Sequence, residues 1–175
     1  ASSQLISVLS EAELQVSVAE VVKKTIDCIG VLVTPYITNL FDAYKSLWGN
    51  CSENSPLRSA LLEGLVSLVQ FSGDKAELLL PNLAPLVVLA CSPTESTSHL
   101  TSSGLSLWLA LERTAGCLTS TPDHGGNQLM RQCLELLLSD PQGIASLLGE
   151  DLKQLMLIIE CAAFRGITSL KYCED

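Results

Sequence analysis

Apolar residues recur along most of this chain at spacings of three and four, the period of an amphipathic α-helix. The first stripe lies within 13–32, and a second stripe follows it. We expect Thr34 to cap the second helix and Pro35 to occupy its first position, where a missing N–H costs little. The second helix should end at Gly49 and Asn50. The two stripes are Leu14, Val18, Val21, Val22, Cys28, Ile29 and Leu32, then Ile37, Leu40, Phe41, Tyr44, Leu47 and Trp48.

A third stripe begins at Ser55-Pro56, which repeats the start signal, and it closes at Ser72-Gly73. Beyond it, Asp74 and Glu77 have the spacing of a capping box. Proline interrupts a helix interior, so we expect Pro81 to restart the chain and the main body of the fourth helix to follow it. The apolar positions are Leu61, Leu62, Leu65, Leu68 and Val69 in the third helix, and Leu83, Leu86, Val87 and Ala90 in the fourth.

The second half of the chain continues the pattern after a connector rich in serine and threonine at 92–98. A fifth helix is predicted from its apolar positions, and a loop is predicted at 115–126. A sixth helix is expected over 127–139, a strong helix over 151–165, and the start of another near Thr168. The apolar positions are Leu100, Gly104, Leu107, Trp108 and Leu111, then Leu129, Met130, Cys133, Leu136 and Leu137, then Leu152, Leu155, Met156, Ile159, Ala162 and Ala163.

A short phrase recurs within this pattern: Thr-Pro-Tyr-Ile at 34–37 corresponds to Leu-Pro-Asn-Leu at 80–83, and the two prolines are 46 positions apart. That interval is typical of helix-hairpin solenoids of the HEAT and armadillo type. We therefore predict an all-α fold, an α-α superhelix of about 3.5 to 4 HEAT repeats, each an antiparallel helix hairpin. Residues 1–175 would form one solenoid fragment of a longer chain. The approximate repeats are 12–50, 56–92, 98–139 and 151–175, the last of them incomplete.

Charge and hydropathy limit the kinds of partner. The chain has 175 residues, with 10 Lys and Arg against 19 Asp and Glu, and its formal net charge is -9. An acidic chain of this kind disfavours direct nucleic-acid binding, which needs clustered basic residues, and suits basic polypeptides better. The longest uncharged stretch, 78–94, is too short to span a bilayer and is interrupted by prolines. We expect no membrane contact.

The residues that usually carry chemistry are scattered. Seven cysteines are widely spaced without any Cys-x-x-Cys pair, and several are in phase with the apolar stripes, as expected for reduced thiols in a core. His99 and His124 stand alone, so no metal ligands or cofactor-binding residues are predicted. The sequence also lacks a nucleophile elbow, a phosphate-binding glycine loop and a helical Glu-x-x-His. We predict no catalytic residues, and the chain is not expected to be an enzyme. The cysteines are Cys28, Cys51, Cys91, Cys117, Cys133, Cys161 and Cys173.

Several phrases occur together in order: TPYITNL at 34–40, the leucine-rich run at 57–93, and GLSLWLALE at 104–112. Over roughly residues 10 to 112 the chain resembles the middle HEAT repeats of the importin-11 branch of the karyopherin-β (importin-β) family. The resemblance implies a nuclear transport receptor that shuttles between cytoplasm and nucleus and holds cargo proteins on a concave surface. It also implies regulation by Ran-GTP, which would bind other parts of the parent chain.

In such receptors the second helix of each hairpin lines the inside. By that analogy Thr38, Asp42 and Lys45, which lie off the apolar stripe of a second helix, are candidate cargo-facing residues. An exposed, solvated helix face is the alternative explanation for them. At the level of the whole protein, the alternative is a HEAT-repeat structural scaffold that organises a multiprotein complex. Helical periodicity does not separate these two functions, whereas a Ran-binding region in the parent chain would.

Overall fold

The computed structural model describes residues 2–52, 55–92, 98–114, 135, 147 and 149–164, with the side chains of 2–10, 12 and 162–164 left out of the description. Within these ranges every regular element is a helix, which confirms the predicted all-α fold class built from packed helix pairs. The chain divides into two compact units, Ala1–Ser72 and Gly73–Asp175. The division falls between the two helices of the predicted repeat 56–92, and the repeat boundaries stay a prediction.

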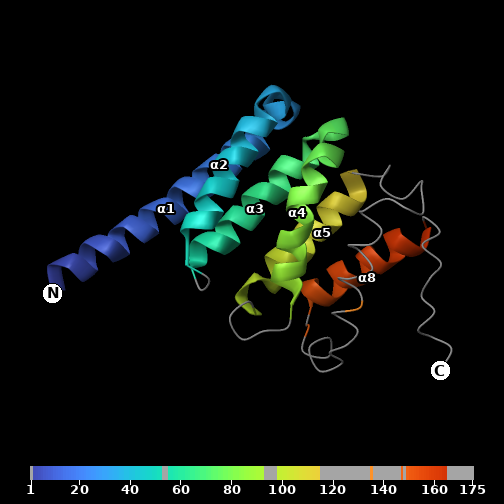
Figure 1. The fold of residues 1–175 in the computed structure, drawn as a ribbon. Coiled ribbons are helices and arrows are strands. Elements are labelled where there is room, and N and C mark those ends of the chain that lie inside the picture. The colour runs from blue at the N-terminus through green and yellow to red at the C-terminus, as the bar shows by residue number, and fades with distance from the viewer. Residues whose placement is uncertain are drawn as a thin grey trace. The chain divides into compact units, whose positions relative to one another are not determined.

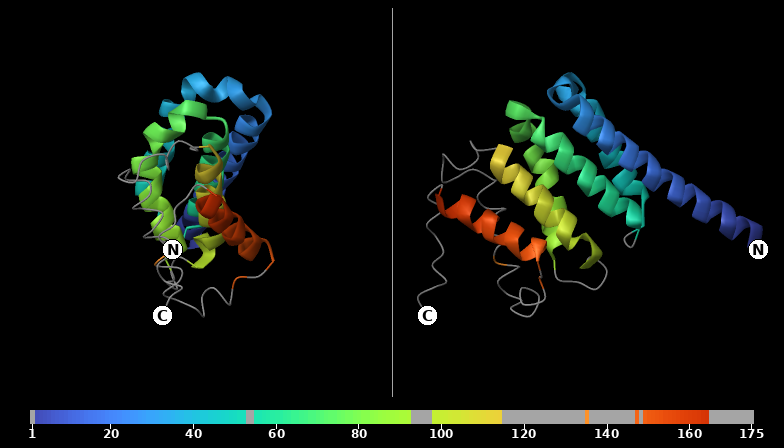
Figure 2. Two further views of the ribbon diagram at one scale, coloured as in Figure 1. Left: turned by 90° about the vertical axis from the view of Figure 1, so that its right-hand side faces the viewer. Right: turned by 180° about the vertical axis from the view of Figure 1, so that it is seen from behind.

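The first unit contains α1 (Ser2–Ile29), the 3₁₀ segment η1 (Gly30–Tyr36), α2 (Ile37–Asn50) and α3 (Pro56–Gln70). Helices α1 and α3 run side by side in the same direction, and α2 runs antiparallel to both (Figures 1 and 2). Both α1 and α2 pack against α3. Helix α3 is therefore the common packing partner of the first hairpin.

The connection between α1 and α2 differs from the predicted proline-initiated helix. Gly30 ends α1 with a φ of 55°, which glycine adopts without strain, and the chain continues as η1. The Thr34 hydroxyl lies 2.6 Å from the carbonyl oxygen of Val31 and 3.3 Å from that of Phe71. It serves as a donor inside η1, so the prediction that Thr34 caps α2 was wrong. Helix α2 instead follows Tyr36, which makes no side-chain capping bond.

The start of α3 confirms the predicted signal. The Ser55 hydroxyl accepts a hydrogen bond of 3.2 Å from the Leu57 N–H, and Pro56 occupies the first turn. This arrangement satisfies a donor that has no partner within the helix and uses a proline where no N–H is needed. The predicted apolar stripe of α3 is fully buried: Leu61, Leu62, Leu65, Leu68 and Val69.

The second unit contains η2 (Gly73–Lys75), α4 (Ala76–Cys91), η3 (Ser98–Leu100), α5 (Thr101–Thr114) and α8 (Glu150–Phe164). Helices α4 and α5 form an antiparallel pair, and α8 packs along α5 (Figure 2). The predicted apolar positions of α5 are all buried, among them Trp108 and Leu111. Close packing between α4 and α5 depends on Gly104, since a Cβ there would lie 2.6 Å from the Cβ of Ala90.

Helix α4 corrects two predictions. Its N-cap is Lys75, which makes no side-chain capping bond, so the expected capping box of Asp74 and Glu77 does not initiate it. The helix also runs continuously through Pro81 and Pro85 instead of restarting. Both prolines are exposed and four residues apart, so the carbonyl groups that they leave without a donor lie on one exposed side, where water can bind them.

The last described helix, α8, confirms a predicted segment but not its whole apolar stripe. Leu155 is buried as expected, whereas Leu152 is exposed and Met156 is 60% exposed. Ile158, which the prediction omitted, is fully buried. The loop at 115–126, the helix at 127–139 apart from residue 135, and the helix near Thr168 lie outside the described residues.

The cysteines within the described ranges carry free thiols. Cys91 is buried, as predicted for a core thiol. Cys28 is exposed and Cys51 and Cys161 are half-buried, so the prediction of core thiols was wrong for Cys28. Cys28 lies near the C-terminal end of α1, on a part of the helix that α3 does not cover.

Candidate binding surfaces

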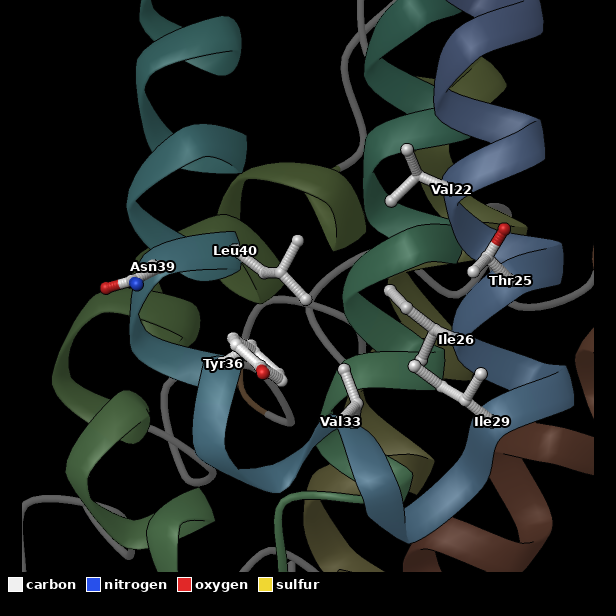
Figure 3. Close-up of a pocket in the computed structure, with 8 residues that line it drawn as sticks. All are labelled: Val22, Thr25, Ile26, Ile29, Val33, Tyr36, Asn39 and Leu40. Carbon is white, nitrogen blue, oxygen red and sulfur yellow. The ribbon is translucent and has the colours of Figure 1, made fainter.

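An open groove of about 420 Å³ lies between α1 and α2 in the first unit. Side chains from α1 form one wall, those from the start of α2 form the other, and Val33 of η1 closes one end (Figure 3). All but two of the lining residues are apolar or aromatic: Val22, Thr25, Ile26, Ile29, Val33, Tyr36, Asn39 and Leu40. Such a groove favours an apolar side chain or helix ridge over a polar ligand.

The α1 side of this groove belongs to a larger exposed apolar surface. The sequence predicted that its stripe would be buried, but Leu14 is 63% exposed and Val21 is 61% exposed, with Val18 and Leu32 also exposed. Among the described side chains of α1, Ala19 and Ile26 are buried. The prediction that this segment is an amphipathic helix was therefore right, but the prediction of which of its apolar residues are buried was wrong.

The last residue of η1 and helix α2 form a second exposed apolar strip. Tyr36 is 61% exposed, Leu40 is half-buried and Leu47 is exposed, and their spacing of four and seven places them on one side. The buried side of α2 consists of Ile37, Phe41 and Tyr44. We define the α1–α2 apolar face as a set of exposed or half-buried apolar and aromatic residues of α1, α2 and the end of η1: Leu14, Val18, Val21, Val22, Ile29, Tyr36, Leu40 and Leu47.

The predicted cargo-facing residues Thr38, Asp42 and Lys45 are all exposed on α2. At 100° per residue they share one side of the helix, well away from the side that carries Tyr36 and Leu40. The structure thus brings the three polar residues together but separates them from the groove. Sequence reasoning identified the polar surface and missed the apolar one, although the stripe of α1 was visible in the sequence.

A small polar cluster lies where α1, α2 and α3 meet. Burial raises the pKa of Tyr44 to about 12, and the negative charge of Asp27 adds to the effect. Burial alone would raise the pKa of Asp27, but hydrogen bonds from Ser67 and from Lys23, whose Nζ lies 3.1 Å from the carboxylate, together lower it. Both shifts move the pKa away from pH 7, so Asp27 is ionised and Tyr44 is neutral there and neither supplies acid-base chemistry. The buried hydroxyl of Tyr44 has no hydrogen-bond partner among the described residues.

Arg58 ties the end of α2 to the start of α3. Its guanidinium lies 4.8 Å from the ring centre of Trp48, and its Nη2 donates a hydrogen bond of 3.4 Å to the carbonyl oxygen of Cys51. Trp48 is half-buried, so it fills the predicted core stripe only in part. These contacts stabilise the turn between the helices.

Other kinds of site find little support in the residues described. Across those ranges there is no group of three or more His, Cys, Asp or Glu side chains placed to hold a metal ion. No helix in the described part of the chain combines the length and apolar character needed to cross a membrane. The surfaces that remain are the polar side of α2 and the α1–α2 apolar face, and both suit contact with another polypeptide.

An all-α array of packed helix pairs, with extended surfaces instead of a cluster of reactive groups in its described part, is the architecture of helical-repeat binding proteins. The chain is 30% identical over 117 residues to importin-11 from Mus musculus and 29% identical over 117 residues to importin-11 from Homo sapiens. Each alignment covers 66% of this chain and 12% of the relative. The similarity confirms the resemblance to the karyopherin-β family of nuclear transport receptors. No protein-family model and no solved structure gives a significant match.

Proposed function

We propose that this chain is a segment of a nuclear transport receptor that binds cargo protein and is regulated by Ran-GTP. The observation that carries the proposal is the similarity to importin-11 over 117 residues, on a chain whose fold is helical in the way that such receptors require. Because the alignment covers 12% of the relative, the segment would supply part of a cargo surface, and Ran-GTP would bind elsewhere in the parent chain. Such a receptor would shuttle between cytoplasm and nucleus.

The formal net charge of -9 supports basic cargo, since complementary charge accelerates encounter and disfavours acidic partners. Thr38, Asp42 and Lys45 are our candidate cargo contacts, because they lie together and exposed on the second helix of a hairpin. Asp42 is the member of the set whose charge suits a basic partner. The lysine beside it would set which basic segments fit, and it would repel those with a positive charge at that point.

The test is a pull-down with the full-length parent protein, in the presence and absence of Ran loaded with a non-hydrolysable GTP analogue. Cargo released only by Ran-GTP supports import. Cargo binding that is indifferent to Ran favours the scaffold function instead.

A pair of charge variants tests the surface itself. Asp42→Lys should slow association of basic cargo several-fold and make it less dependent on salt. Asp74→Lys, at an exposed position in the other unit, changes the net charge equally and is the matched control. Equal effects of both variants would mean that only total charge matters and that the polar side of α2 is not a cargo contact.

A further inference from the structure

The α1–α2 apolar face is large enough to form a protein interface. Leu14 is 63% exposed, and Val21 and Tyr36 are each 61% exposed. Eight side chains that expose on the order of 100 Å² each approach the roughly 800 Å² per partner that a dimer of standard size buries. Monomeric proteins rarely expose a contiguous apolar patch of that area. Among the described residues of the first unit, no helix covers it.

This face carries a groove and a ridge on the same helix. The groove of about 420 Å³ lies beside the C-terminal half of α1, where Val22 and Ile29 line it (Figure 3). Both α1 and α2 pack mainly against α3, which leaves the groove between them open. Leu14, Val18 and Val21 precede the groove at spacings of four and three, so they form a continuous ridge. A ridge of this kind packs into a groove on a neighbouring helix pair.

The ridge extends beyond the hairpin that carries the groove. Helix α1 has 28 residues, against 14 in α2 and 15 in α3, so at 1.5 Å per residue it is about 20 Å longer than either. Figures 1 and 2 show its N-terminal half projecting past both neighbours, and Leu14 lies in this half. The ridge cannot enter the groove of its own chain, because both lie along one helix. A second copy of the chain can supply it.

We propose that the α1–α2 apolar face is the interface of a two-fold symmetric homodimer, in which α1 of each copy packs antiparallel to α1 of the other. The ridge of one copy then fills the groove of its partner, and the reciprocal contact forms at the same time. The ridge is centred near Val18 and the α1 wall of the groove near Thr25, so the two-fold axis passes close to Val21. The inference does not depend on the transport function.

The charges beside the face agree with the antiparallel orientation. Glu20 and Lys24 are exposed on one flank of α1, on either side of the two-fold axis. In the antiparallel pair Glu20 of one copy lies level with Lys24 of the partner, whereas a parallel pair would align like charges. Glu11 lies on the same side of α1 as Val18. It falls beyond the end of the partner's α1, at the rim of the interface, where a charge stays in water.

The test is the concentration dependence of the mass of the 175-residue chain. Sedimentation velocity between about 1 and 100 µM should show a shift from the monomer mass of 18.7 kDa to twice that value, with no larger species. A chain that stays monomeric at the highest concentration would overturn the proposal. Growth beyond the dimer would also overturn it, because such growth indicates a head-to-tail contact that does not close.

Charge variants locate the interface. Val21→Asp places two carboxylates beside the two-fold axis, and Tyr36→Glu places one on the other wall of the groove. Each should weaken dimerisation at least about tenfold, because the charge would be buried without a partner. Both residues are exposed, so both variants should keep the circular dichroism of the unaltered chain. Leu78→Asp, at a 75% exposed position in the other unit, is the matched control and should dimerise normally. A dimer that survives both face variants would contradict the proposal.

Exchange of the flanking charges tests the antiparallel orientation. Lys24→Glu should weaken the dimer several-fold, because Glu20 of the partner would then face a like charge. Adding Glu20→Lys restores the net charge of the chain and the opposite charges across the interface, so the affinity should recover. Lys153→Glu changes the net charge equally at an exposed position of the other unit and controls for general repulsion. Failure of the double variant to recover the affinity would rule out the antiparallel pairing.

Discussion

Replacing Gly64 with alanine probes the close contact between α3 and Tyr44 of α2. A Cβ at position 64 of α3 would lie 2.6 Å from Cζ and 2.7 Å from Cε1 of Tyr44, and closer still to its hydroxyl oxygen. Tyr44 is buried on α2, so its ring has little room to move. Overpacking of this kind costs about 1 to 3 kcal/mol. Alanine regains about 1 kcal/mol of helix propensity over glycine. We therefore expect a net loss of up to about 2 kcal/mol.

Urea unfolding followed by far-UV circular dichroism measures this loss. Gly49→Ala is the matched control, since nothing lies within 4 Å of a Cβ at the end of α2, and it should leave the free energy of unfolding unchanged or raise it. Adding Tyr44→Phe to Gly64→Ala should recover part of the loss, because the hydroxyl is the nearest atom. If Gly64→Ala proved as stable as Gly49→Ala, the close contact between α2 and α3 would be refuted.

Three further predictions concern the same chain. Since Tyr44 has a pKa of about 12 in the folded state against 10.0 normally, its unfolded form loses the proton first, and stability should fall by up to about 3 kcal/mol between pH 10 and pH 12. Urea melts at pH 9 and pH 11 should show a smaller fall in Tyr44→Phe. Leu65→Asp should lower the free energy of unfolding by more than about 3 kcal/mol, while Leu78→Asp at an exposed site changes it by less than about 0.5 kcal/mol in the same assay. Ser55→Ala should cost about 1 kcal/mol, read from the shift in thermal midpoint, through loss of the cap of α3.

The sequence predicted the start of a helix correctly where the stabilising hydrogen bond joins neighbouring residues. Ser55 begins α3 as predicted because its hydroxyl and the Leu57 N–H are two residues apart and need nothing else. The same reasoning failed at Thr34, which has an equally good local signal. Its hydroxyl lies 2.6 Å from the carbonyl oxygen of Val31, three residues back, and 3.3 Å from that of Phe71, 37 residues away, so it donates within η1 and toward Phe71 instead of capping α2. The sequence alone gave no indication that these carbonyl groups would accept the hydrogen bond from Thr34.

Pro81 shows a second limit of local reasoning. A proline in a helix interior removes one hydrogen bond and crowds the preceding turn, at a cost of about 3 kcal/mol. The sequence therefore predicted a break. Helix α4 continues because its buried side, which includes Leu79, Leu83 and Val87, gains more from uninterrupted packing than the exposed side loses. Which side carries the proline decides the outcome, and that depends on what surrounds the helix.

The candidate surfaces follow from the same distinction. An amphipathic stripe shows that a helix has an apolar side, but it does not show what covers that side. In α3 and α5 the covering helices are present, so the stripe and the core coincide. In α1 the stripe extends past Ala19 and Ile26 onto an exposed edge. Because hydrophobic burial is nondirectional, the sequence of α1 is equally consistent with a core and with an interface. Only the arrangement of its neighbours separates the two, and among the described residues of the first unit no helix covers this edge.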